Sequence, residues 1–339
     1  MELIETEKAV GCVLCHDITQ IIKGKTKDAI FRKGHIVTEE DIPVLLSVGK
    51  RHLYVWKNDE NMLHENDAAL ILKDACKNAY MSESAIKEGK IELIAECDGI
   101  LKIDTDRLLA INMLEDIMIA TIHQNQFIRK GQKIAGMRVI PLVIEKAKLE
   151  KVKEIYDGKP LLEILPMKAK KVGIVTTGSE VYHGLIKDAF GPVIRDKMAF
   201  YGCEVVGQTI VDDNLDMIKA AIKSYLDQKV DMVVCTGGMS VDPDDLTPSA
   251  IKSLDGELVS YGAPVLPGAM FLLSYMQDGT PVLGLPGCVM YHKTTIFDLA
   301  FPRLLCNEKL TKKDLAVLGH GGLCHNCAVC HYPNCEFGK

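Results

Sequence analysis

The sequence predicts an α/β protein whose main domain, residues 170–305, is a three-layer α/β/α sandwich with a mostly parallel sheet, preceded by smaller β-rich domains. Three short apolar runs that lead into glycine-bearing turns support this, at 172–175, 232–235 and 280–285. Further apolar or amphipathic segments lie between them: helix-like ones near 195–201 and 215–226 and a strand-like one at 204–210. Alternating buried strands and helices are typical of a parallel sheet covered on both faces.

The amino-acid composition indicates a globular protein and argues against binding to nucleic acids. Hydrophobic residues make up 47% of the 339 residues and charged residues 25%, which is the balance of a globular protein. The net charge of −6 and the 6% aromatic content argue against a nucleic-acid partner. We find no apolar run of about 18 residues that would cross a membrane. The acidic start, residues 1–7, does not resemble a signal peptide, so we expect a cytoplasmic protein.

The remainder of the chain divides into three predicted regions. Residues 1–58 are predicted to form an α+β region, with a short helix at 42–47 and a strand at 52–56. Residues 59–166 are predicted to form a β-rich domain that begins with a polar helix over 65–84. Its predicted strands and its helical connector are short segments, at 91–95, 99–103, 117–122, 133–144 and 145–154. Residues 306–339 form a tail.

Three loops at the predicted strand ends share one chemical character, since their glycines expose backbone N–H groups and their hydroxyls add donors. Their candidate ligand-binding residues are Thr177, Gly178 and Ser179, then Thr236, Gly237, Gly238 and Ser240, then Pro286 and Gly287. Such donors suit phosphate, although each loop alone could be a tight turn. Glu180 and Asp245 lie among them, and these carboxylates could hold Mg²⁺ that is shared with a phosphate. Ligands of parallel sheets bind beyond the carboxyl ends of the strands.

These motifs resemble those of molybdopterin-binding domains, in order and at suitable spacing over residues 170–305. Residues 177–181, Thr-Gly-Ser-Glu-Val, are similar to the TGDEL sequence of that family. Residues 236–241 with Asp245 resemble its GGVSVG signature and following Asp, and residues 285–287 resemble its LPG turn. The Asp212-Asp213 pair resembles the acidic pair after the second strand. More loosely, residues 31–55 resemble the N-terminal portion of the gephyrin-like molybdopterin molybdenumtransferases.

The resemblance implies that the loops bind the pterin and its phosphate. It also implies catalytic roles for Glu180, for Asp213 or its neighbour Asp212, and for Asp245, which would handle Mg²⁺ or molybdate. The family reaction inserts molybdate into adenylylated molybdopterin, so the first hypothesis is a Mg²⁺-dependent transferase. A homo-oligomer is expected by resemblance.

Two departures from the transferase pattern keep a second function open. Residues 266–269 read Leu-Pro-Gly-Ala where the transferases usually have Lys-Pro-Gly-Lys, and Cys288 follows the LPG turn. The lost cations favour a non-catalytic carrier that delivers the cofactor to a molybdoenzyme, whereas the acidic set favours catalysis. Lys293 or Arg195 could replace a missing cation. A nucleotide-type hydrolase on the same fold is a further alternative.

The tail has a separate signal. Cys324, Cys327, Cys330 and Cys335 lie within residues 324–335, at C-x₂-C-x₂-C-x₄-C spacing. Soft ligands at this density in a reducing compartment predict a metal, either Zn²⁺ in a Cys₄ knuckle or an iron–sulfur cluster. A disordered thiol-rich tail is the alternative.

Overall fold

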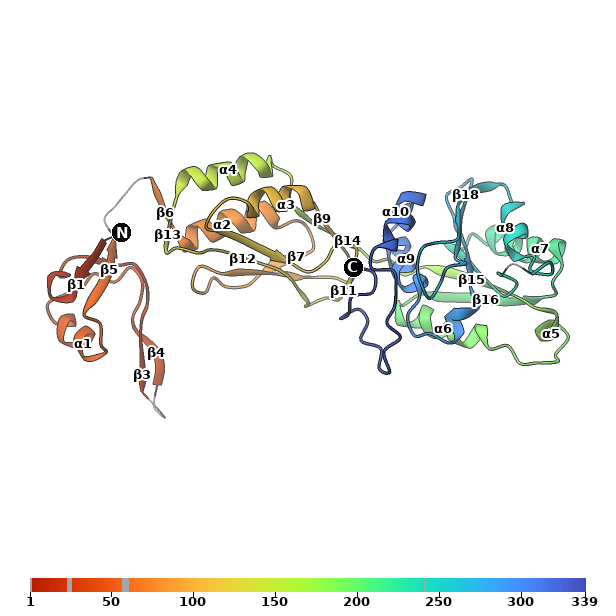
Figure 1. Ribbon diagram of the computed structural model, residues 1–339, viewed down its shortest axis with the longest axis horizontal. Coiled ribbons are helices and arrows are strands. Elements are labelled where there is room, and N and C mark those ends of the chain that lie inside the picture. Colours follow the sequence, from red (N-terminus) through yellow and green to blue (C-terminus); the bar gives the residue numbers. More distant parts are fainter. Residues whose placement is uncertain (1, 23–25, 57–60, 241) are drawn as a thin grey trace. The chain divides into compact units, whose positions relative to one another are not determined.

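The structure is a computed structural model that describes residues 2–22, 26–56, 61–240 and 242–339 (Figure 1). Its contacts divide the chain into two compact units. One comprises residues 1–94, 103–121 and 133–163, and the other comprises residues 95–102, 122–132 and 164–339. Within the described ranges, no helix has the length and apolar character needed to cross a membrane.

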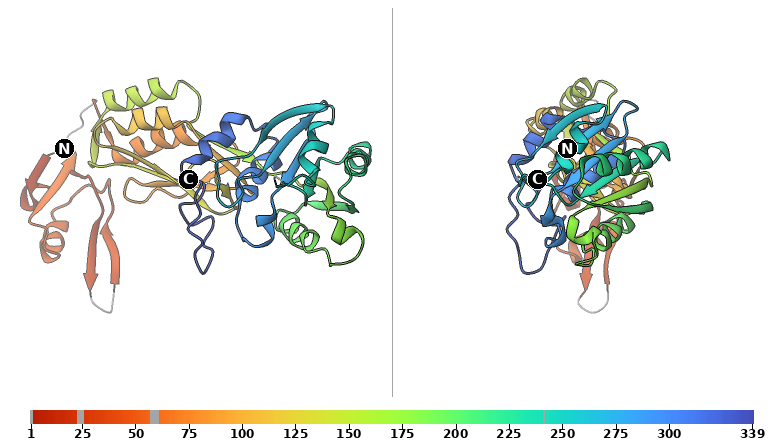
Figure 2. Two further views of the ribbon diagram at one scale, coloured as in Figure 1. Left: turned by 45° about the vertical axis from the view of Figure 1, so that its right-hand side comes forward. Right: turned by 90° about the vertical axis from the view of Figure 1, so that its right-hand side faces the viewer.

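The N-terminal part of the first unit is a small α+β structure, coloured red to orange in Figures 1 and 2. Its elements are β1 (Glu2–Glu5), η1 (Thr6–Lys8), β2 (Val13–Leu14), β3 (Ile18–Ile22), β4 (Thr26–Phe31), α1 (Asp41–Ser47) and β5 (His52–Trp56). Strands β1, β5 and β2 form one antiparallel sheet, and β3 and β4 form a hairpin. Leu14, Leu45 and Leu53 are buried between α1 and this sheet. The helix predicted at 42–47 and the strand predicted at 52–56 are both present.

The rest of the first unit combines short strands with helices. Its elements are β6 (Met62–His64), α2 (Glu65–Cys76), β7 (Met81–Glu83), β8 (Ile91–Ala95), α3 (Thr105–Asn112), β10 (Ile117–Thr121), β12 (Lys133–Val139), β13 (Val143–Glu145) and α4 (Lys146–Tyr156). The helix predicted over 65–84 ends at Cys76, because Lys77 is extended with φ −72° and ψ 131°. Tyr80 then takes a positive φ of 62°, which no right-handed helix allows.

The second unit is built on one six-stranded sheet. Its strands and helices are β15 (Lys171–Thr177), α5 (Ser179–Tyr182), α6 (Phe190–Phe200), β16 (Glu204–Val211), α7 (Leu215–Asp227), β17 (Met232–Thr236), α8 (Thr247–Lys252), β18 (Gly256–Tyr261), β19 (Leu272–Met276), β20 (Pro281–Leu285), η2 (Gly287–Met290), α9 (Ile296–Leu305), α10 (Lys312–Ala316) and η3 (Val317–Gly319). The strand order is β16-β15-β17-β20-β19-β18. The first four strands are parallel; β19 pairs antiparallel with β20, and β18 pairs antiparallel with β19. Three short strands, β9 (Gly99–Ile103), β11 (Phe127–Ile128) and β14 (Leu162–Pro166), form a separate sheet.

Helices cover both faces of the six-stranded sheet (Figure 1). Val172 and Ile174 of β15 pack in the core that α6 and α9 cover, and Val175 packs in the core beneath α7 and α8. Alternate residues of a strand point to opposite faces, so a strand buried on both sides is apolar at every position. The predicted α/β/α sandwich with a mostly parallel sheet is therefore confirmed.

Tyr225 of α7 explains a glycine in the middle of β15. A Cβ at Gly173 would lie 2.4 Å from Cγ of the Tyr225 ring, so the ring packs directly on the strand backbone. The Tyr225 hydroxyl lies 3.0 Å from Thr209 Oγ1 of β16. This contact fixes α7 over the strands whose carboxyl ends form the candidate site.

Candidate functional site

The strand register brings the predicted loops to one edge of the sheet. Thr177, the last residue of β15, pairs with Val211 of β16. Thr176 pairs with Thr236 of β17, which in turn pairs with Leu285 of β20. Because all four strands are parallel and end level with one another, the segments that follow them emerge side by side.

The first loop is joined to the acidic pair that follows β16. The backbone N–H of Ser179 donates to Asp213 Oδ2 at 2.9 Å, and the Ser179 hydroxyl donates to Asp212 Oδ1. His183 Nε2 lies 3.4 Å from the other oxygen of Asp212. The hydrogen bond from Ser179 lowers the pKa of Asp212, which is therefore ionised at neutral pH. Glu180 is exposed at the start of α5.

The second loop packs tightly on the first. A Cβ at Gly237 would lie 2.0 Å from the carbonyl oxygen of Thr177, and the residue has φ +83°. A Cβ at Gly238 would lie 3.0 Å from Thr177 Oγ1 and 3.6 Å from Asp213 Oδ1. Thr177 Oγ1 also lies 3.1 Å from Thr247 Oγ1 at the start of α8. Four chain segments therefore meet at Gly238, and glycine is the residue that permits this approach.

Thr236 contributes differently from the other loop residues. It is fully buried, and its hydroxyl donates to Thr176 Oγ1 at 3.2 Å inside the sheet. Gln208 Nε2 donates to the same Thr176 oxygen at 2.9 Å and to Asp188 Oδ2 at 2.6 Å. These bonds use the Thr236 side chain to join neighbouring strands. A ligand could therefore reach only the backbone that follows Thr236, not its hydroxyl. Ser240, by contrast, is exposed.

Asp245 differs from the other acidic residues of the candidate site because one of its carboxylate oxygens, Oδ2, is buried without a hydrogen-bond partner among the described residues. Burial, with a smaller contribution from the negative charge of Asp245, raises the pKa of Tyr261. The Tyr261 hydroxyl donates to the carbonyl oxygens of Met239 and Ser240 at 3.0 and 3.2 Å, which fixes the second loop. A buried carboxylate oxygen without a donor is costly, unless a ligand or ion supplies one.

The third loop leaves free space at its glycine. Pro286 is buried, whereas Gly287 is exposed and a Cβ there would meet nothing within 4 Å. The loop is joined to the second one because the Met239 side chain lies over Gly284, 2.5 Å from where its Cβ would be. Burial raises the pKa of the Cys288 thiol, so this residue is not an activated nucleophile.

The predicted metal ligands do not form a preassembled centre. Among the described residues, no three His, Cys, Asp or Glu side chains lie in an arrangement that could hold a metal ion. In the tail, Cys324 and Cys335 are partly buried, and Cys327 and Cys330 are exposed. Mg²⁺ usually takes only one or two protein carboxylates and completes its shell with water and substrate phosphate. Asp245 Oδ2, which no described residue bonds, fits that role.

Several residues of the site are not marked by the sequence motifs. Thr247, Gln208, Asp188 and Tyr261 shape the loops through tertiary contacts. Only Thr247 has a local signal, since Thr-Pro at the start of a helix is typical of a helix N-terminus. The others become recognisable only when the strands are placed side by side.

Two parts of the chain match family models. Residues 173–305 match the family described as "Probable molybdopterin binding domain". Residues 3–57 match a family described as "Domain of unknown function (DUF8806)".

Similar proteins match only part of the chain. A "CinA-like protein" of Mycolicibacterium paratuberculosis is 38% identical over 119 residues, which are 35% of this chain and 27% of that protein. The protein of the same description from Mycobacterium tuberculosis is 37% identical over 90 residues, 26% of this chain and 21% of that protein. The chain thus spans about a quarter of the length of these curated relatives.

Solved structures also resemble part of this chain. The molybdopterin biosynthesis enzyme MoaB of Thermus thermophilus aligns with a TM-score of 0.35 at 23% identity, over 41% of this chain and 98% of that one. The protein CinA of Thermoplasma acidophilum aligns with a TM-score of 0.30 at 21% identity, over 35% of this chain and 89% of that one. The family match and the sequence motifs coincide at the loops described above. Residues 173–305 therefore belong to the family of probable molybdopterin-binding domains.

Proposed function

We propose that the edge formed by the three loops binds the phosphate-bearing pterin of molybdenum cofactor biosynthesis and catalyses Mg²⁺-dependent insertion of molybdate into its adenylylated form. The observation on which this rests is the buried Oδ2 of Asp245, which has no hydrogen-bond partner among the described residues and lies beside loops that are rich in glycine. Glycines 237 and 238 bring the second loop against Thr177, and Gly287 leaves space at the third. Exposed backbone N–H groups in such turns can bind phosphate oxygens.

A bound cation would offset the negative charges at this edge. Asp212, Asp213 and Asp245 would repel a phosphate, since like charges at short range disfavour one another. Asp245, with Glu180 as a second carboxylate, would hold Mg²⁺ that is shared with the phosphate. When bound, the ion supplies Lewis acidity that favours departure of the nucleotide. The chain itself positions the acids, because Ser179 holds Asp212 and Asp213 through its hydroxyl and its N–H.

A second candidate function, a carrier of finished cofactor for a molybdoenzyme, is supported by the turn at 266–269. Leu266 is 56% exposed, and the next residues, Pro267, Gly268 and Ala269, provide no cation for a phosphate. The carrier would use the same loops to bind the pterin but would not release a nucleotide. Binding and nucleotide release must therefore be measured separately.

The first experiment compares Asp245→Asn with the wild type in two assays, anaerobic titration with molybdopterin and Mg²⁺-dependent release of AMP from adenylylated molybdopterin with molybdate. We expect AMP release to fall by at least about tenfold, since even indirect metal partners contribute about 10–100-fold to metal affinity. In the absence of Mg²⁺ the pterin should still bind, with equal or higher affinity, because the substitution removes a negative charge that repels the phosphate. Asp244→Asn is the matched control, because its side chain is exposed in the same loop.

The outcomes separate the candidate functions. Equal AMP release by the wild type and Asp245→Asn removes Asp245 from the mechanism. Pterin binding without AMP release by the wild type supports the carrier. Hydrolysis of a pyridine nucleotide without pterin binding would instead support the nucleotide-type hydrolase.

A further inference from the structure

The last part of the chain folds back into a closed loop, residues 321–338, which we call the cysteine loop. The N–H of Gly338 donates to the carbonyl oxygen of Gly321 at 2.9 Å and closes it. A Cβ at Gly321 would lie 2.2 Å from the carbonyl oxygen of Lys339, and one at Gly338 would lie 2.3 Å from Leu299 Cδ2 of α9. Both glycines have positive φ. The closure thus requires glycine at both ends.

The loop is attached to the α/β domain at several points. The carbonyl oxygen of Leu266 accepts a bond from the N–H of Cys324 at 2.8 Å, and the Leu266 N–H donates to the carbonyl oxygen of Gly322 at 2.8 Å. The Tyr332 hydroxyl donates to the carbonyl oxygen of Asp298 at 3.0 Å, and Phe337 is only 5% exposed in the core. A thiol-rich segment without a role would not need such anchors, since ordering it costs conformational entropy.

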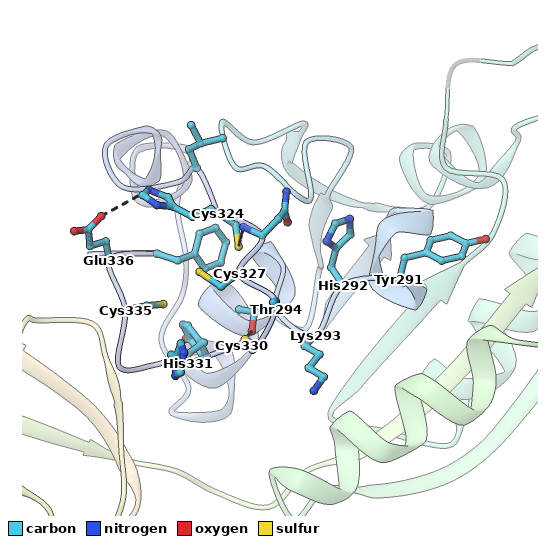
Figure 3. A pocket seen from close by; sticks show the side chains of 16 residues that line it. Tyr291, His292, Lys293, Thr294, Cys324, Cys327, Cys330, His331, Cys335 and Glu336 are labelled. Atoms are coloured by element: carbon cyan, nitrogen blue, oxygen red, sulfur yellow. Dashed lines mark hydrogen bonds and ion pairs between the residues drawn. The ribbon is translucent and has the colours of Figure 1, made fainter.

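All four thiols of the loop line one cavity (Figure 3). The cavity has a volume of about 560 Å³, and its lining includes Cys324, Cys327, Cys330 and Cys335. On the side of the domain it is lined by His292, Lys293 and Thr294, which follow the third loop of the candidate site. Its volume lies within the range of about 300–1,000 Å³ that is typical of ligand pockets.

Two of the sulfur atoms already have hydrogen-bonding neighbours of the kind that a thiolate needs. The N–H of Asn326 donates to Cys324 Sγ at 3.4 Å, and Asn326 adopts a positive φ of 51° that directs it there. Thr294 Oγ1 lies 3.3 Å from Cys330 Sγ. Donors to sulfur stabilise metal-bound thiolates and tune the potential of iron–sulfur clusters.

The dimensions of the cavity bear on whether the cysteines hold a single ion or a cluster. Zn²⁺ binds four thiolates at about 2.3 Å, so its ligands touch one another and leave no space between them. The four cysteines here line one cavity of about 560 Å³ instead, and among the described residues no three His, Cys, Asp or Glu side chains are placed to hold a single metal ion. A multi-atom inorganic core fits that arrangement better. The C-x₂-C-x₂-C spacing is also that of ferredoxin-type cluster sites.

We propose that the cysteine loop binds a [4Fe–4S] cluster through Cys324, Cys327, Cys330 and Cys335. Lys293 and the histidines at 292, 325 and 331 line the cavity, and its lining includes one carboxylate, Glu336, which lies 3.7 Å from His325. This lining suits a core whose thiolate-ligated form is anionic. The inference is independent of pterin binding, because none of the cysteines belongs to the three-loop edge.

The test uses the full chain, purified without oxygen and reconstituted with ferrous iron and sulfide. The wild type should retain about four irons and four acid-labile sulfides per chain, and chemical reduction should give a paramagnetic resonance signal. Cys327→Ser and Cys330→Ser should each lose most of the iron. Because both side chains are exposed, these substitutions should leave the circular dichroism and the thermal midpoint of the apoprotein unchanged. Cys97→Ser, a partly buried thiol outside the loop, is the matched control and should retain the cluster.

Three results would overturn the proposal. One is about one tightly bound zinc per chain, with thiolate coordination and no iron, which would identify a zinc knuckle. Another is a wild-type chain that retains no metal after reconstitution. The third is equal iron and sulfide content in the wild type, Cys327→Ser and Cys330→Ser.

Discussion

Replacing Gly237 by alanine should destabilise the α/β domain strongly, because the second loop has no room for a side chain. The new Cβ would lie 2.0 Å from the carbonyl oxygen of Thr177, a backbone atom of a buried strand that cannot move aside alone. Left-handed backbone costs an L-residue about 1–2 kcal/mol. Overpacking costs a further ~1–3 kcal/mol, so the total is about 2–5 kcal/mol. This is a large fraction of the roughly 5–15 kcal/mol by which a domain is stable.

The assay is urea denaturation followed by far-ultraviolet circular dichroism, since the single tryptophan, Trp56, lies outside the α/β domain. Hydrogen exchange at β17 would assign the loss to this part of the chain. Gly287→Ala is the control, because its Cβ would meet nothing within 4 Å, and its stability should stay within about 0.5 kcal/mol of the wild type. A Gly237→Ala midpoint as close to wild type as that of Gly287→Ala would refute the described packing of the two loops.

Two further predictions concern stability. Glu308 is half-buried; burial raises its pKa, but hydrogen bonds from Arg303 and Lys102 outweigh this and lower it below 4.5. The ionised Glu308 therefore stabilises the fold fully above pH 4.5, and this stabilisation is lost as the pH falls through the lowered pKa. Glu308→Gln should flatten the acid limb of a plot of unfolding free energy against pH. An unchanged acid limb would contradict this. Gly173→Ala should cost about 1–3 kcal/mol by displacing the Tyr225 ring, measured by urea denaturation, and the reasoning fails if that variant is as stable as the wild type.

Three strands of the candidate site, β15, β17 and β20, could be predicted from the sequence because they are buried on both faces. Residues 172–175 and 232–235 are continuous apolar runs that end in glycine-bearing turns, and both became parallel strands of the central sheet. In contrast, β18 and β19 were not predicted. Residues 256–261 have a mixed pattern, since β18 is an edge strand whose pairing is set by its neighbour.

The chemistry of the site was less accessible to sequence reasoning than its position. The burial of Asp245 Oδ2, which has no partner in the described part of the chain, and the bond between Thr177 and Thr247 depend on contacts between residues far apart in the chain. The role of Thr236 within the sheet likewise follows from its partner Thr176 on the adjacent strand. Local patterns specify strands and turns, whereas burial and pairing of polar atoms depend on the assembled fold.

The most direct test of the central claim is the ligand that accompanies the protein. The chain should be purified without oxygen from cells that make molybdenum cofactor, then denatured and oxidised so that any molybdopterin becomes a fluorescent pterin. The proposed function predicts up to about one pterin per chain and a marked loss of bound pterin in Gly237→Ala. The pterin content of Gly287→Ala shows whether the ligand needs the free space at the third loop. Absence of pterin from the wild type, together with no binding of added molybdopterin at micromolar concentration, would contradict the assignment of this edge as a pterin site.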